Sequence, residues 1–352
     1  MMAEKIKKIT GMRLFMPIVC LFIVLLVNVI RTPDFFNITL KDGQLSGWLI
    51  DVINRGSELV ILAIGMTLVT AASGGQDISV GAVMAVAAAV CCQILSGGEV
   101  STNTLAAPII IAAIAGILVA ALCGAFNGFL VAKLNIQPMV ATLILFTAGR
   151  GIAQLVTQGQ ITYVRVESYK AMGGFLGPIP TPVIFAVAAV IVAYLVLNKT
   201  ALGMYIESVG INSHASRLIG LNSTRIKFLT YVICGALAGL AGIVASSRIY
   251  SADANNIGLN LEMDAILAVA LGGNILSGGK FSLMGSVIGA YTIQALTTTL
   301  YAMSVPSDQL PVYKAIVVII IVVLQSPVYK KAMQNYKAKR QSKKAVVQGG
   351  EQ

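Results

Sequence analysis

An uncharged run of 27 residues decides the fold class: Ala106-Ala-Pro-Ile-Ile-Ile-Ala-Ala-Ile-Ala-Gly-Ile-Leu-Val-Ala-Ala-Leu-Cys-Gly-Ala-Phe-Asn-Gly-Phe-Leu-Val-Ala132. A helix needs about 20 mainly apolar residues to cross the hydrocarbon core of a bilayer, so this run is long enough to span a membrane. Of the 352 residues, 57% are hydrophobic and only 11% are charged. Soluble domains carry about 25% charged residues, and disordered chains have low hydrophobicity. Both classes are therefore excluded.

Nine further apolar runs flank this one. Several are short or rich in glycine, so we expect an all-α polytopic membrane protein with about ten transmembrane helices, some of them short or broken. The first run follows basic residues but ends at Arg31-Thr-Pro-Asp34, which is not a cleavage site, so we interpret it as an uncleaved span. The ten predicted spans are Arg13–Ile30, Leu59–Ala72, Gly81–Leu95, Ala106–Ala132, Met139–Leu155, Thr181–Leu197, Phe228–Ser246, Ala265–Leu276, Met284–Tyr301 and Val312–Leu324.

The distribution of basic residues predicts the orientation. With ten spans and a cytoplasmic N-terminus, 17 of the 25 Lys and Arg residues fall on the cytoplasmic side, as the positive-inside rule requires. Both termini are therefore predicted to be cytoplasmic, and the net charge of +11 is an orientation signal that gives no support to nucleic-acid binding. The predicted organisation is a cytoplasmic segment over 1–12, a transmembrane permease domain over 13–326 and a basic cytoplasmic tail over 327–352.

The chain lacks the residues of several kinds of catalytic site. Its five cysteines lie in apolar runs without a CxxC spacing, and His214 is the only histidine, so neither a metal site nor a catalytic residue is predicted. The segment Gly273–Phe281 is similar to a phosphate-binding loop, but Gly279 stands where the essential lysine should be and Phe281 where Ser or Thr should bind Mg²⁺. We therefore predict no enzyme activity and no cofactor bound by this chain.

A polar, glycine-rich segment, Gly74-Gly-Gln-Asp-Ile-Ser-Val-Gly81, separates two apolar runs. Asp77 and Ser79 are residue types that cap helix N-termini, which suggests that a helix begins there. Broken backbone at membrane depth is tolerated only where protein or a water-filled cavity satisfies it. One interpretation is a translocation path or gate at Gly74, Gly75, Asp77, Ser79 and Gly81; the other is an ordinary turn between helices.

The same residues recur 204 positions later. Glu58, Ser73-Gly74-Gly75 and Gly81 correspond to Glu262, Ser277-Gly278-Gly279 and Gly285, which is either an internal repeat or chance in a glycine-rich chain. Glu262 and Asp264, with Glu58 and Arg150, are ionisable residues in or beside apolar runs, where charge is costly. They could shape a polar vestibule or hold the bundle together by ion pairs. We assign Glu262, Asp264, Gly278 and Gly279 to the same candidate path.

The sixth connection is predicted to carry a short cytoplasmic helix. Asn212 or Ser213 can cap its N-terminus, and Gly220 can end it at the C′ position. The segment is either a connector in the lipid interface or a docking element for a cytoplasmic partner. The docking interpretation assigns the contact to Glu207, Gly210, Asn212, His214, Arg217 and Gly220.

Three motifs give the chain a family resemblance. Gly74–Met84 resembles the signature Gly-Gly-Ile-Asp-Leu-Ser-Val-Gly-Ala-Val-Met of membrane permeases of ABC-type sugar importers, with departures at Gln76 and Ile78. Gly203–Asn222 resembles the loop of these permeases that couples to the ATPase, and Leu261–Val269 resembles their Glu-x-Asp-Ala-Ile-Leu-Ala-Val segment. The resemblance is to the ribose, xylose and galactose branch, and Ile136–Leu145, Ala148–Gly151 and Ala252–Asn256 look most similar to galactofuranose-type permeases.

The resemblance implies a bacterial inner-membrane subunit that works with partners. These are a second permease subunit, identical or paralogous, a cytoplasmic ABC ATPase that binds the coupling helix within 204–222, and an extracytoplasmic sugar-binding protein. ATP and Mg²⁺ would be bound by the ATPase. The implied function is ATP-driven import of a monosaccharide, such as galactofuranose or another simple sugar. The alternative from the residues alone is a secondary transporter or facilitator for a small polar solute.

Overall fold

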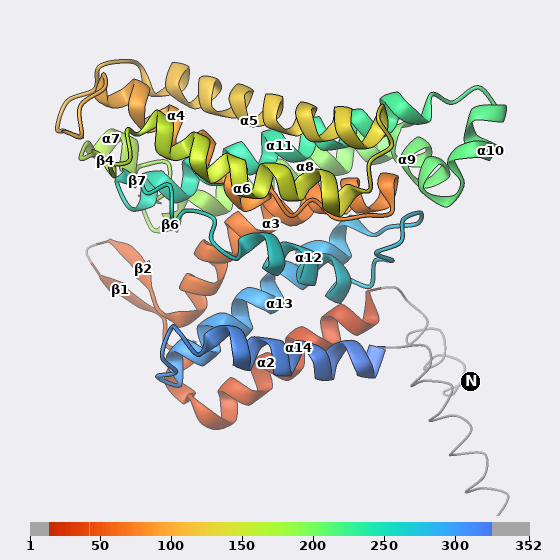
Figure 1. Ribbon diagram of the computed structural model, residues 1–352. Coiled ribbons are helices and arrows are strands. Elements are labelled where there is room, and N and C mark those ends of the chain that lie inside the picture. The colour runs from red at the N-terminus through yellow and green to blue at the C-terminus, as the bar shows by residue number, and fades with distance from the viewer. Residues whose placement is uncertain (1–13, 42, 326–352) are drawn as a thin grey trace, which may run out of the picture. The chain divides into compact units, whose positions relative to one another are not determined.

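Thirteen α-helices make up most of the described part of the protein, which is residues 14–41 and 43–325 of a computed structural model (Figure 1). The predicted segment 1–12 and the predicted tail 327–352 lie outside the described residues. The helices are α2 (Phe15–Arg31), α3 (Trp48–Ser73), α4 (Val80–Ser96), α5 (Ile109–Ala132), α6 (Pro138–Val156), α7 (Glu167–Lys170), α8 (Thr181–Lys199), α9 (Leu202–Ile211), α10 (Ser213–Leu218), α11 (Ser223–Arg248), α12 (Leu261–Leu271), α13 (Leu283–Ala302) and α14 (Leu310–Gln325).

Each of the ten predicted spans overlaps one of these helices, but two bounds were wrong: α3 begins at Trp48 rather than Leu59, and α12 ends at Leu271 rather than Leu276. Five of the described helices, α3, α5, α6, α8 and α11, are long and apolar enough to cross a bilayer by themselves. Among the others, α2, α4, α12 and α14 are shorter, and α13 is long enough but rich in threonine. The prediction of an all-α polytopic membrane protein with short or broken spans is thus confirmed.

Helix α3 is the centre of the bundle. It packs against α11, α13, α8 and α12, and 94% of the residues in its most apolar window are buried. The corresponding share is 22% for α5 and 17% for α8, whose outward side chains include Ile110, Leu122 and Ile191. A helix that is apolar all round and yet exposes large aliphatic side chains is suited to lipid rather than water.

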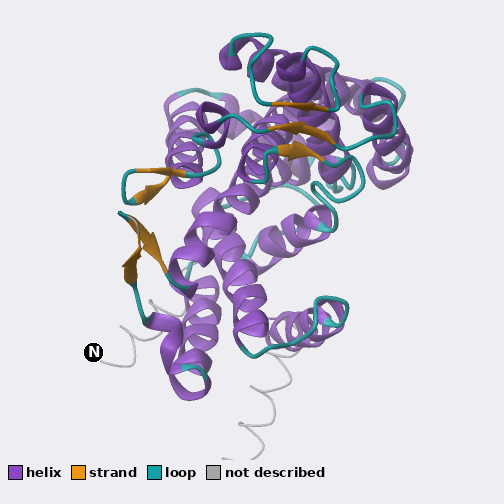
Figure 2. Cartoon of the chain, turned by 90° about the vertical axis from the view of Figure 1, so that its left-hand side faces the viewer, coloured by secondary structure: helices purple, strands orange, loops and turns teal. Residues whose placement is uncertain are grey.

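Three small sheets lie in the connections and were not predicted. Strands β3 (Ser101–Thr102), β4 (Thr162–Val164) and β7 (Ser251–Ala252) form one sheet in the order β3-β4-β7, with β3 parallel and β7 antiparallel to β4. The other two are hairpins, β1 (Thr39–Lys41) with β2 (Gln44–Ser46) and β5 (Phe175–Leu176) with β6 (Ile179–Pro180). Figure 2 shows all three among the helix ends on one side of the bundle, the side predicted to face outward.

Glycines bring α5 and α11 into backbone contact. A Cβ added to Gly235 of α11 would lie 2.9 Å from the Cα of Gly124 on α5, and a Cβ on Gly124 would lie 3.1 Å from the Cα of Gly235. Gly124 with Gly128 and Gly235 with Gly239 each have the GxxxG spacing. Small residues at this spacing let helices approach closely in a membrane, where van der Waals packing replaces the hydrophobic effect.

The second compact unit of the chain begins at Ser304 and contains α14. Its described helix is mainly apolar, with one charged residue, Lys314, near its start, as expected for a membrane span.

Replacing Gly235 with valine should therefore destabilise the bundle. The added side chain has no room between α5 and α11, and overpacking of this kind costs about 1–3 kcal/mol. We expect a thermal unfolding midpoint several degrees lower in detergent. The matched control is Gly151→Val, because a Cβ on the helical Gly151 has no heavy atom within 4 Å. Equal midpoints for the two variants would contradict the role of this contact.

Candidate functional site

The first glycine-rich segment is a true interruption between two helices. Helix α3 ends at Ser73, and Gly74 follows in the left-handed conformation with φ of 66°, its N–H donating to the carbonyl oxygen of Thr70. Helix α4 begins only at Val80. The interruption predicted from the sequence is thus present, and Gly74 provides the positive φ that ends α3 at low cost.

Asp77 and Ser79 form a buried polar cluster with Asn127 of α5. The Asp77 carboxylate accepts hydrogen bonds from the backbone N–H of Ser79 at 2.9 Å and from its hydroxyl at 2.6 Å. The Asn127 amide donates to the Ser79 hydroxyl oxygen at 2.8 Å. The side chains of Asp77 and Ser79 are only 2% and 0% exposed. Hydrogen bonds within the cluster therefore replace the water that these groups lose.

The structure corrects the capping role expected for these two residues. Ser79 is at the N-cap position of α4 but makes no side-chain hydrogen bond to the helix, because its hydroxyl is committed to Asp77. The interruption is fixed to α6 as well, since the N–H of Ile78 donates to the hydroxyl oxygen of Thr142. Asn127 and Thr142 were missed by sequence reasoning. The only available signal was an isolated polar residue within each apolar run.

Gly81 lies against the start of α12. A Cβ on Gly81 would collide with the Oε2 atom of Glu262 and with the carbonyl oxygen of Gly258. Glu262 is 1% exposed, and its Oε2 atom is buried without a hydrogen-bond partner among the described residues. The structure thus brings two of the predicted path motifs together, while Asp264 is also buried in the first turn of α12.

Arg150 holds the segment that leads into α12. Its Nη1 atom donates to the carbonyl oxygens of Ala254, Asn255 and Ile257 at 2.9, 3.0 and 3.1 Å. These carbonyl oxygens lie outside any helix and so lack a helical N–H donor. The Arg150 guanidinium donates hydrogen bonds to all three in place of the missing backbone donors. Of the two roles considered for Arg150, the geometry supports the structural one.

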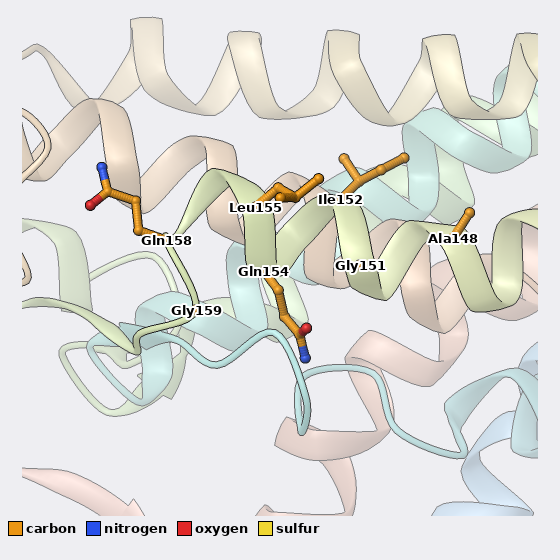
Figure 3. A pocket seen from close by; sticks show the side chains of 7 residues that line it. All are labelled: Ala148, Gly151, Ile152, Gln154, Leu155, Gln158 and Gly159. Atoms are coloured by element: carbon orange, nitrogen blue, oxygen red, sulfur yellow. The ribbon is translucent and has the colours of Figure 1, made fainter.

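A hollow runs along α6 beside Arg150, and it is separate from the predicted path residues. It is lined by Ala148, Gly151, Ile152, Gln154, Leu155, Gln158 and Gly159 (Figure 3). Ile152 and Leu155 point to one side of α6, while Gln154 points to the other, where its amide donates to the side-chain oxygen of Asn255. Leu155 is largely exposed. The hollow therefore opens on the outer surface of the bundle.

The second interruption, Gly272–Ser282, is stabilised by Asn274. Its Nδ2 atom donates to the Val269 carbonyl oxygen, the Ser282 carbonyl oxygen and the Ser286 hydroxyl oxygen, and its Oδ1 accepts from the Ser282 N–H at 2.6 Å. Ser282 caps α13 by accepting from the N–H of Gly285. Asn274 therefore does in this interruption what Asp77 and Asn127 do in the first. Sequence reasoning missed it.

The two interruptions touch each other through their glycines. A Cβ on Gly74 would lie 2.7 Å from the carbonyl oxygen of Ser277, and a Cβ on Gly278 would lie 3.0 Å from the Cα of Gly74. Gly278 and Gly279 have φ values of 93° and 95°, which favour glycine. The central glycines of the two recurring segments, Gly74 and Gly278, are thus in direct contact, whether or not the segments come from an internal repeat.

The sixth connection contains two short helices, α9 and α10. The Asn212 side chain accepts hydrogen bonds from the N–H groups of His214 and Ala215, each at 3.0 Å, and Gly220 follows the C-cap with φ of 87°. The predicted cap and stop of this helix are confirmed. Arg217 donates from Nε to the Ser223 hydroxyl oxygen at 2.6 Å, which ties α10 to the start of α11.

The predicted docking residues do not all face outward. Asn212, His214, Arg217 and Gly220 are exposed, and Glu207 is half-buried. Gly210 instead lies against the bundle, where a Cβ would collide with the carbonyl oxygen of Ala71 at the end of α3. The most exposed apolar side chains of the region are Leu218 and Ile219, at 89% and 75%, and they were not among the predicted residues.

Comparison with known proteins identifies the family. Residues 48–325, more than three quarters of the chain, match the family model described as branched-chain amino acid transport system / permease component. The chain belongs to this permease family. It is a multi-pass membrane permease of a bacterial transport system and not an enzyme.

Its curated relatives are similar over nearly their whole lengths. The chain is 47% identical to the galactofuranose transporter permease of Escherichia coli K12, over 88% of each chain, and 39% identical to a fructose import permease of Bifidobacterium longum, over 95% of this chain and 94% of the relative. It is 33% identical to the ribose import permease of Escherichia coli K12, over 88% of this chain and 92% of the relative. No solved structure matches. The resemblance stated from the sequence motifs is confirmed.

Gly81→Ala should impair transport. Its methyl group would displace the Gly258 carbonyl, which is backbone and cannot rotate away, and a clash of this kind costs about 1–3 kcal/mol. We expect slower uptake in vesicles at equal membrane levels of protein. Gly151→Ala, a helical glycine with open space around it, should transport like the wild type. Unimpaired uptake by the Gly81 variant would show that the contact with α12 is not needed.

Arg150→Met should loosen the segment before α12, because three backbone carbonyl oxygens, two of them part-buried, lose their charged donor, and a buried acceptor left without a partner costs about 1–3 kcal/mol. We expect faster hydrogen exchange over 253–260 in the purified protein. The control is Gln154→Met, which removes a single side-chain contact to the same segment. Equal exchange in the two variants would argue against Arg150 as the anchor.

Proposed function

We propose that this chain forms the membrane pathway of an ATP-driven sugar importer. The observation that carries the proposal is that the galactofuranose, fructose and ribose permeases match it over 88% of its length or more. Galactofuranose is the first candidate substrate because that relative shares 47% of its residues, and another simple sugar is the second. The permease domain of the proposal is 13–326, with the coupling helix within 204–222.

A cytoplasmic ABC ATPase is the proposed partner at α9 and α10. The Asn212 cap and the Arg217–Ser223 hydrogen bond give this segment a fixed shape. Leu218 and Ile219 project from this segment beside Arg217. They are exposed although the segment lies at the predicted cytoplasmic end of α8, where water would surround them. A rigid element that presents apolar side chains to water has the features of a protein interface. ATP and Mg²⁺ are assigned to the ATPase and not to this chain.

The proposed path lies at the two interruptions. Gly74, Gly75, Asp77, Ser79 and Gly81 form one side, and Glu262, Asp264, Gly278 and Gly279 the other. Contact between Gly74 and Gly278 and between Gly81 and Glu262 supports this grouping. Interrupted helices are the usual location of a solute pathway in a transporter, because they place polar backbone at membrane depth.

An extracytoplasmic sugar-binding protein and a second permease subunit complete the proposal. The outward-facing end carries two charged side chains, Glu167 and Lys170, on either side of Tyr250. The Tyr250 hydroxyl donates to Glu167 at 2.6 Å, and the Lys170 ammonium lies over the Tyr250 ring. A hydrogen bond with Tyr250 raises the pKa of Lys170, and the ordinary lysine pKa already keeps this group charged at neutral pH. Such fixed charges suit a transient protein contact.

The decisive experiment is reconstitution of the permease in vesicles with its ATPase and its binding protein. We expect uptake of galactofuranose, or of ribose or fructose, only with ATP and with the loaded binding protein. Uptake without nucleotide that follows a proton or sodium gradient would overturn the proposal in favour of a secondary transporter.

Leu218→Asp should release the ATPase, because it places a charge at the centre of the proposed apolar contact. We expect loss of the ATPase from the complex purified through the permease. Ile179→Asp, which changes a half-exposed apolar side chain in the outward hairpin, should keep it. Retention of the ATPase by the Leu218 variant would exclude this docking surface.

A further inference from the structure

Gly210 lies where three separate parts of the backbone meet. It belongs to the last turn of α9, and a Cβ on it would collide with the carbonyl oxygen of Ala71 and would lie 2.6 Å from the backbone nitrogen of Gly279. A Cβ on Gly278 would lie 3.2 Å from the carbonyl oxygen of Gly210. We call α9 and α10 together the docking segment. No side chain can fit between this segment, the end of α3 and the second interruption.

A backbone hydrogen bond closes this junction. The N–H of Gly279 donates to the carbonyl oxygen of Ala71 at 2.9 Å, beside Gly210, and so joins the second interruption to α3. Side chains can absorb a displacement by changing rotamer, whereas backbone in direct contact cannot. A movement of α9 is therefore transmitted at this point both to the end of α3 and to the second interruption.

An apolar cluster surrounds the junction and strengthens it. Its buried members come from the end of α3, from α9 and from the start of α11, and its partly buried members include Phe281 of the second interruption. The buried side chains are Leu68, Ala71, Ala72, Ile206, Val209 and Ile226. Densely packed clusters of this kind move as units rather than deform.

We propose that Gly210 is a positioning residue for transport. Because glycine has no side chain, the docking segment packs directly on the end of α3 and on the 272–282 interruption, and the three parts form one rigid body. Movement of the docking segment then shifts both glycine interruptions together. The proposal rests on the proposed function, because it assumes that an ATPase moves the docking segment. It changes the role predicted for Gly210 from a contact with the ATPase to a contact within the permease.

Distances between spin labels in the complete importer test this directly. Met204 on α9 and Ile275 in the second interruption are exposed and can be replaced by labelled cysteine, because four of the five native cysteines are buried and Cys123 can be changed to serine. We expect the distance between the labels to stay the same between the nucleotide-free and ATP-trapped states. A change of more than about 2 Å, the size of a helix shear movement, would overturn the proposal.

Gly210→Ala supplies the second test, with Gly151→Ala as the helical control. We expect the Gly210 variant to keep the ATPase and to hydrolyse ATP, while sugar uptake falls about tenfold or more, as when a critical geometry is displaced by an ångström or so. Uptake equal to the control would overturn the proposal. If the variant does not assemble, the label distances in the unmodified importer decide. Absence of ATP-dependent uptake in the wild type would instead contradict the proposed function itself.

Discussion

Backbone groups freed inside a membrane have no water to bind, and this constraint governs the structure. Polar side chains bond the freed backbone at these breaks: Asp77 accepts from the N–H of Ser79, Arg150 donates to three carbonyl oxygens before α12, and Asn274 bonds the backbone at both ends of the second interruption. Because these few groups replace a helical hydrogen-bond network, they also fix where the interruptions lie. The compensation is incomplete among the described residues, because Asn127 Oδ1, Arg150 Nη2 and Glu262 Oε2 are buried without a hydrogen-bond partner.

Helix α3 is held at the centre of the bundle by a partly buried ion pair and by close backbone contacts. The helix carries Glu58, whose carboxylate pairs with Arg248 of α11, and its end meets α9 and the second interruption. Small residues on the neighbouring helices let backbones approach, as Gly124 and Gly235 do for α5 and α11. Glycines thus allow close backbone packing in two places: between α5 and α11, and where α9 meets the end of α3 and the second interruption.

The sequence predicted the spans well and their contacts poorly. Hydropathy is a local signal, so all ten predicted spans overlap helices, although the predicted Ala265–Leu276 runs past the end of α12 at Leu271. The Asn212 cap could be predicted from residue type. The strands were missed because two or three residues carry no periodicity. Asn127, Thr142 and Asn274 were missed because a lone polar residue forms no motif. The contact of Gly210 with the end of α3 could not be predicted, because spacing shows that a glycine is required but not which backbone it meets.

The contrast between α3 and the outer helices has an evolutionary consequence. On α5 and α8, most positions of the apolar window are not buried inside the protein, and one aliphatic side chain can replace another there with little change in stability. Their sequences can therefore drift quickly among related permeases while hydropathy is kept. On α3, nearly every side chain has protein neighbours on all sides, so a substitution succeeds only with a compensating change elsewhere. Correlated substitutions should concentrate around this one helix.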